Sequence, residues 1–141
     1  MSSQPQRKGR LLSAKDAYTG KQGLIYNVGV SAETVGARAL HMQVATIPPL
    51  GRGKAHKHPA HETAIYALTG VSGVWHGDNL EHHDLVRPGD FFYIPANVAH
   101  LPYNPSDSEE VVVLIARTDP NEQEHVALLP ELDALHLEPT A

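Results

Sequence analysis

Residues 56–62 read HKHPAHE, which places three histidines and one glutamate within seven positions. Imidazole nitrogens and carboxylate oxygens bind transition metals. The chain has no cysteine, so disulfides, iron–sulfur clusters, Cys-type zinc fingers and thiol catalysis are excluded. Any metal site must therefore use nitrogen and oxygen ligands, and the ten histidines of the chain are their most prominent source.

His56 and His58 have a spacing that suits a strand. Residues i and i+2 of a strand point to the same face, so both imidazoles can converge on one point inside a barrel while Lys57 faces outward. Such a pair is weak evidence by itself, because surface strands also carry it. The alternative interpretation of these two histidines is a solvated strand.

A third histidine, His100, lies in the segment PGDFFYIPANVAHLPYN, residues 88–104. A turn at Pro95-Ala96-Asn97 precedes it, and asparagine suits such a turn because it tolerates positive φ. His100 then starts a returning strand that can neighbour the strand of His56. The alternative for His100 is a histidine packed at a hairpin.

Short runs of strand character, separated by glycine and proline, occupy most of the chain between residues 23 and 117. They cover residues 23–30, 38–47, 54–58, 62–69, 71–76, 80–86, 90–94, 98–103 and 111–117. No helical pattern is evident before about residue 120, and DALHL in the tail is compatible with a short helix or a strand. Many short strands at close spacing predict an all-β sandwich or barrel.

These two histidine segments resemble the two conserved motifs of the cupin superfamily. The first motif matches from Leu50 or Gly51 through His56 and His58 to Gly70. The second motif matches at Gly89, Pro95, His100 and Asn104, and 18 residues separate Gly70 from Gly89. The resemblance spans about residues 40–117 and implies a double-stranded β-helix (jelly-roll) barrel over residues 21–118.

The resemblance also implies a metal held by His56, His58, Glu62 and His100. Counting forward from His58, Glu62 has the spacing of the family's glutamate, but counting back from Gly70 the position is Thr63. A one-residue bulge would reconcile the two counts, and bulges occur at barrel rims beside sites. His61 is the rival fourth ligand, and Thr63 is expected to line the pocket.

Three imidazoles and one carboxylate suit one divalent transition metal, namely Fe, Mn, Zn, Ni or Cu. The resemblance therefore favours an enzyme that acts on a small-molecule substrate at an open metal site, by dioxygenase-type or isomerase/lyase-type chemistry. The alternative is a non-catalytic metal- or ligand-binding cupin module, because a fold does not determine a reaction.

Outside the barrel we expect an N-terminal flexible or swapped arm over residues 1–20. A C-terminal tail over residues 119–141 is expected to pack on the barrel or on a second subunit, and the resemblance implies a homodimer. The formal net charge of −5 and the pI near 6.0 show no basic patch, which argues against nucleic acid and membrane partners. The N-terminus lacks an apolar signal region, so a cytoplasmic location is expected.

Overall fold

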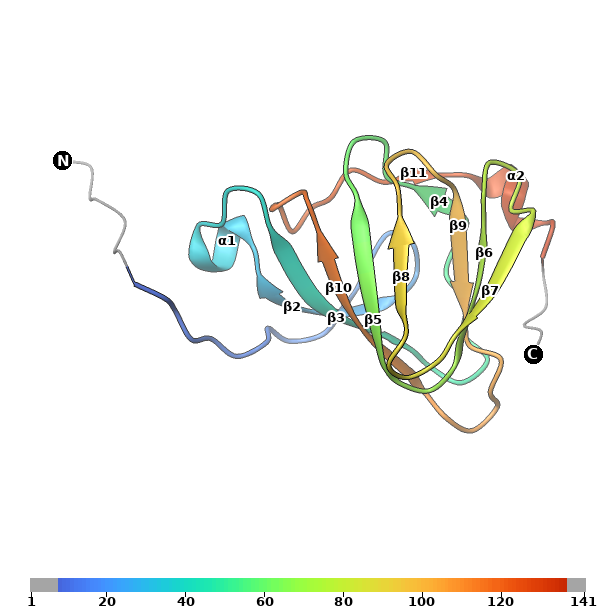
Figure 1. The fold of residues 1–141 in the computed structure, drawn as a ribbon, viewed down its shortest axis with the longest axis horizontal. Helices are drawn as coiled ribbons and strands as arrows, with labels where there is room; N and C mark the ends of the chain where they lie inside the picture. Colours follow the sequence, from blue (N-terminus) through green and yellow to red (C-terminus); the bar gives the residue numbers. More distant parts are fainter. Residues whose placement is uncertain (1–7, 137–141) are drawn as a thin grey trace.

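Two antiparallel sheets face each other in the computed structural model, which describes residues 8–136 (Figure 1). The six-stranded sheet has the order β1-β2-β3-β10-β5-β8 and the five-stranded sheet the order β11-β4-β9-β6-β7. The first sheet comprises β1 (Tyr18–Thr19), β2 (Ile25–Val30), β3 (His41–Ile47), β5 (Thr63–Thr69), β8 (Phe91–Ile94) and β10 (Val111–Arg117). The second comprises β4 (His56–Lys57), β6 (Ser72–His76), β7 (His82–Val86), β9 (His100–Tyr103) and β11 (Ala127–Leu128). The predicted all-β, double-stranded β-helix fold is confirmed.

Alternating side chains build the core between the sheets. In β3, residues at every second position from His41 to Ile47 are buried, as expected for a strand with one face on a core. The larger core cluster combines side chains from both sheets: Leu24, Tyr26, Ala45, Ile47, Ala67, Val74, Val86, Val111 and Val113. A second cluster comprises Ala55, Leu80, Ala99, Leu101 and Tyr103.

The C-terminal tail packs on the barrel of its own chain. Leu129 and Leu132 contact the second core cluster, and β11 pairs with β4, Leu128 opposite His56. A short helix, α2 (Pro130–Asp133), follows, and Asp133 accepts a hydrogen bond from the backbone N–H of Ala55. The tail therefore holds the strand that carries His56.

One short helix was not expected from the sequence. Helix α1 (Ala32–Val35) occupies a single turn before β3. Ser31 caps it, because its hydroxyl accepts from the Thr34 N–H while the Thr34 hydroxyl accepts from the Ser31 N–H. This reciprocal capping is a local signal, whereas the sequence prediction relied on periodicity over a longer window, so a one-turn helix was missed.

The predicted N-terminal arm over residues 1–20 falls partly outside the described residues. Within the described part, the Lys15 N–H donates to the Val28 carbonyl, and β1 pairs with β2. Within residues 8–136, no helix is both long and apolar enough to span a membrane.

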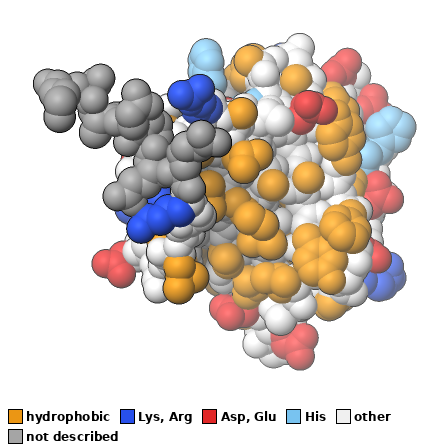
Figure 2. Space-filling view, turned by 60° about the vertical axis from the view of Figure 1, so that its left-hand side comes forward, with side chains coloured by type: hydrophobic (Ala, Val, Ile, Leu, Met, Phe, Trp, Pro, Cys, Tyr) orange, Lys and Arg blue, Asp and Glu red, His pale blue; other side chains and the backbone are white. Residues whose placement is uncertain are grey.

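The outer face of the six-stranded sheet is apolar. Of its six strands, only β10 contains an aspartate, glutamate, lysine or arginine, and this residue, Arg117, is buried. Met42 and Phe91 are exposed, the latter by 79%. Figure 2 shows hydrophobic side chains gathered on the side of the molecule that it presents.

Candidate metal centre

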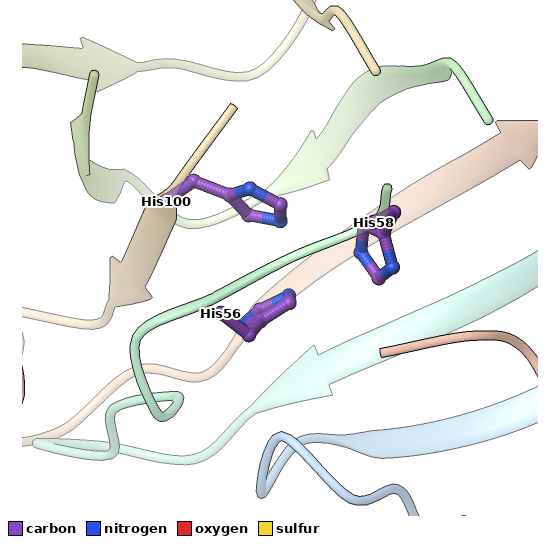
Figure 3. Close-up of side chains that lie close together, drawn as sticks. All are labelled: His56, His58 and His100. Carbon is purple, nitrogen blue, oxygen red and sulfur yellow. The ribbon is translucent and has the colours of Figure 1, made fainter. Parts of the chain in front are cut away.

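Three imidazoles converge on one point (Figure 3). His56 in β4 is directly paired with His100 in β9, and His58 follows β4 in the chain. One ligand nitrogen of each lies within 4.8 Å of those of the other two, and all three side chains are buried. The structure thus brings together three of the four predicted ligands.

Backbone carbonyls fix the orientation of these rings. His56 Nδ1 lies 2.6 Å from the Lys54 carbonyl oxygen, and His100 Nδ1 lies 3.0 Å from that of Val98. His58 Nδ1 lies 3.3 Å from the carbonyl oxygen of His125. Because a carbonyl oxygen can only accept, each Nδ1 carries the proton of a neutral ring, and each Nε2 keeps a free lone pair.

Burial keeps the three rings neutral. It lowers the pKa of His56 to about 4, with a further contribution from the neighbouring His58. Burial likewise lowers the pKa of His58 and takes that of His100 well below its usual range. Neutral imidazoles are the form that binds metals, so the centre is in the ligating protonation state at neutral pH.

The turn of the second motif is tied to the first motif. Asn97 has φ of 64°, as the sequence predicted, and its N–H donates to the His58 carbonyl at 2.8 Å. Asn104 is fully buried, and its side-chain amide donates to the carbonyls of Ile47 and Glu109. The Asn97 bond holds the turn before His100 beside His58, and the Asn104 bonds fix the far end of the same strand.

Glu62 lies apart from the three histidines. It is exposed, and its carboxylate accepts a hydrogen bond from the Tyr93 hydroxyl at 2.6 Å. The neighbouring residue Thr63 is buried instead. This agrees with the count back from Gly70, which places Thr63 at the position of the family's glutamate. A bulge does occur in β5, but it leaves Leu68 unpaired, because Ala67 pairs with Val113 and Thr69 with Val112. Lying at Leu68, it does not turn Glu62 inward.

A second group of metal-ligating side chains adjoins the first and shares His58. Ligand atoms of His58, His61 and Glu124 lie within 4.8 Å of one another. Glu124 Oε2 is 3.7 Å from His58 Nδ1 and 3.6 Å from His61 Nε2. The rings of His58 and His61 stack with their centroids 4.5 Å apart. Sequence reasoning named His61 as a rival ligand but missed Glu124, which lies outside both motifs.

An apolar cavity of about 60 Å³ lies beside the histidines. His56 and His100 line it, together with Thr63, Ser72, Tyr26 and a shell of aliphatic and aromatic side chains from both sheets. The described lining contains no aspartate, glutamate, lysine or arginine. Because a water molecule takes about 30 Å³ of liquid, the cavity has room for a very small molecule or for part of a larger one.

The side chains present fit a divalent transition metal. Three neutral nitrogen donors are buried, held from behind by carbonyls, and free at Nε2. Neutral imidazole nitrogens of this kind are the donors that a divalent transition metal binds.

The fold and the histidine cluster define a cupin barrel with a candidate metal site. Residues 43–116, slightly more than half of the chain, match the family model of the cupin domain. The chain therefore belongs to the cupin family. No curated protein shows a significant match.

Solved structures with the same fold are distant in sequence. The oxalate decarboxylase of Lactobacillus farciminis, solved as a formate complex, is 18% identical with a TM-score of 0.68, covering 86% of this chain and 36% of its own. A Bacillus subtilis oxalate decarboxylase studied for its Mn(II) centres is 18% identical with a TM-score of 0.64, covering 78% and 29%. An uncharacterized Klebsiella pneumoniae protein with a double-stranded β-helix domain is 15% identical with a TM-score of 0.65, covering 86% and 97%. The chain thus spans about a third of the length of the two decarboxylases.

Proposed function

We propose that this cupin is a metal-dependent enzyme that acts on a small organic molecule at the centre formed by His56, His58 and His100. The observation that carries the proposal is the set of three buried imidazoles whose Nδ1 atoms face backbone carbonyls. This arrangement presents three Nε2 lone pairs to one ion. Three protein ligands also leave coordination positions open, as in catalytic metal sites.

The nitrogen donors suit Fe(II), Mn(II), Ni(II), Cu(II) or Zn(II) better than calcium or magnesium. Manganese is a candidate also because a structurally similar decarboxylase is described with Mn(II) centres. When bound, such an ion supplies Lewis-acid or redox chemistry at its open positions. The histidines themselves hold the ion and stay neutral because they are buried.

The cavity beside the histidines constrains the substrate. Its described lining is uncharged and mostly apolar. A dianion such as oxalate would find no cationic side chain there, and the ion alone would have to balance both of its charges, so the oxalate chemistry of the similar structures is not the activity we propose. A neutral molecule with an apolar part fits this lining better, and the apolar walls exclude water from the reacting centre.

Between the two predicted reaction types, the cavity favours oxygenase-type chemistry over isomerase or lyase chemistry. Isomerases and lyases usually need a positioned general base. The described lining has no carboxylate or amine, and Tyr26 offers no phenolate to act as a base, because burial raises its pKa well above the usual range and keeps the hydroxyl protonated. A reaction in which the metal centre activates the substrate or dioxygen places less demand on the surrounding side chains.

Metal analysis followed by an oxygen-uptake screen tests the proposal. The protein is purified without chelator, analysed for metals, and reconstituted separately with Fe(II), Mn(II), Ni(II), Cu(II) and Zn(II). We expect about one ion per chain and oxygen consumption with a catechol-like or dicarbonyl compound. His100→Ala is expected to weaken metal binding more than about 100-fold, beyond the loss typical for a group that only supports a ligand.

Two results would change the conclusion. If no transition metal binds even after reconstitution, the metal-dependent enzyme is refuted. If metal binds at the histidines but no compound of either class is turned over, the result favours the alternative, a non-catalytic metal- or ligand-binding module, over the enzyme.

A further inference from the structure

Glu124 brings a carboxylate to the metal centre from outside both motifs. Its side chain is 12% exposed, and Oε2 lies between His58 Nδ1 at 3.7 Å and His61 Nε2 at 3.6 Å. The residue precedes β11, in the segment that leads from β10 back across the barrel. It also lies beyond residues 43–116, which match the cupin domain.

His58 depends on this segment in a way that the other two histidines do not. His56 and His100 find their Nδ1 acceptors two residues earlier in the chain, at Lys54 and Val98. The carbonyl facing His58 Nδ1 belongs to His125, 67 residues further along the chain. Glu124 Oε2 lies 3.7 Å from the same nitrogen, so the carbonyl and the carboxylate that face His58 Nδ1 belong to adjacent residues of the C-terminal segment.

Glu124 is itself held in place on both oxygens. Gln22 Nε2 donates to Oε1 at 2.7 Å, and Arg117 Nη1 lies 3.2 Å from Oε2. Arg117 is buried, and it donates to the carbonyls of Asp119 and Asn121. The guanidinium therefore fixes the turn of the segment and points the carboxylate toward His58 and His61.

The guanidinium also argues against a separate second ion at His58, His61 and Glu124. A divalent ion there would lie beside a cation that already neutralises Oε2. It would further need His58 Nδ1 to lose the proton that faces the His125 carbonyl. A carboxylate behind a ligating histidine, by contrast, is a common support of metal sites because it fixes the tautomer and raises the basicity of the ring.

We propose that Glu124 is a positioning residue of the three-histidine centre, acting through His58. Its charge, together with the His125 carbonyl, holds the proton on His58 Nδ1 and leaves Nε2 free for the ion. This inference rests on the proposed function, because it assumes that His56, His58 and His100 bind a metal.

The test compares Glu124→Gln with Glu62→Gln, the same change at an exposed glutamate that lies apart from the cluster. Dissociation constants for Co(II) and Zn(II) are measured by competition with a chromophoric chelator, and the visible spectrum of the Co(II) form is recorded. We expect Glu124→Gln to weaken both metals by about 10- to 100-fold and to shift the Co(II) spectrum. We expect Glu62→Gln to change neither, and Glu124→Asp, which keeps the charge, to recover part of the affinity.

Several outcomes would overturn the inference. The inference fails if Glu124→Gln binds metal as tightly as the natural protein with an unchanged spectrum. It also fails if Glu124→Gln loses the metal as completely as His100→Ala, because Glu124 would then be a ligand. If Glu124→Gln melts at a lower temperature without metal yet keeps its affinity and spectrum, its role is only structural. Should Glu124→Gln not fold, Glu124→Asp decides, because its side chain is one methylene shorter and draws the carboxylate away from His58. Affinity and spectrum identical to those of the natural protein would then contradict the inference. If the natural protein binds no metal, or if His100→Ala binds it equally well, the proposed function fails independently of Glu124.

Discussion

At the scale of single residues, His56 shows how the burial of a candidate metal ligand couples its protonation to unfolding. Its ring is buried among two other imidazoles, and its pKa is lowered to about 4. In the unfolded chain a histidine has a pKa of about 6.5. Between these two values the unfolded chain binds a proton that the folded metal-free protein does not, so acid favours unfolding.

We therefore predict that the metal-free protein loses stability as the pH falls from about 6.5 to about 4. The expected loss from His56 alone is roughly 3 kcal/mol, and the lowered pKa values of His58 and His100 act in the same direction. Urea unfolding of chelator-treated protein across this pH range measures it. His56→Asn removes one titrating group and should flatten the dependence. A free energy of unfolding that stays constant from pH 7 to pH 4.5 would contradict the burial of neutral rings.

The resemblance of two segments to the cupin motifs was enough to predict that His56, His58 and His100 lie together, because each lies on or beside a strand that the motifs define. The carboxylate could not be predicted in the same way. Side chains alternate between the two faces of a strand, so a shift of one residue decides whether Glu62 or Thr63 faces inward. No strand alternation or motif spacing predicts where Glu124 lies, because its position depends on how the tail folds back over the barrel end.

At the scale of elements, β5 lies in the first motif and is followed by a residue that only glycine suits. All nine predicted strands are present, and β1 and β11 were not expected because two-residue strands leave no periodic signal. Gly70 follows β5 with φ of +73°. A Cβ built there would lie 2.4 Å from the Glu110 carbonyl oxygen, in the loop that precedes β10.

We predict that Gly70→Ala destabilises the protein by about 2 kcal/mol or more. The left-handed conformation costs a non-glycine residue about 1–2 kcal/mol, and the contact with backbone adds to it. Gly9→Ala is the control, because nothing lies within 4 Å of its added carbon. Thermal and urea unfolding of both variants give the comparison. Equal stability of Gly70→Ala and the natural protein would mean that the turn after β5 can rearrange freely.

At the scale of the whole molecule, the two sides of the barrel differ. The tail covers the side of β4 and β9, where Leu129 and Leu132 pack on the protein's own core. No described segment comparable in size to the tail covers the outer face of the six-stranded sheet. The strands of this sheet carry no exposed charged side chain. Antiparallel sheets that face water usually alternate apolar and polar residues, so this face departs from the expectation for a solvated surface.

The homodimer expected from the sequence is still a prediction, and the apolar face now offers it a specific surface. Met42, Tyr66, Phe91 and Leu114 line one shallow groove on it. A second copy is the occupant we favour, because an uncharged face imposes no charge repulsion on a two-fold contact with itself. Light scattering during gel filtration is expected to give twice the 15.3 kDa mass of the chain. Phe91→Glu places a charge at a side chain that is 79% exposed and should yield the monomer without unfolding it.

Leu135→Glu is the matched control, because Leu135 is a 53% exposed leucine in the tail, which the sequence suggested for contacts with a second subunit. If the dimer forms through the sheet, Leu135→Glu remains dimeric and Phe91→Glu does not, since burying an unpaired carboxylate in an apolar interface is costly. The reverse result would assign the interface to the tail. A natural protein that is monomeric at micromolar concentration would leave the apolar face without a second copy and would contradict the prediction.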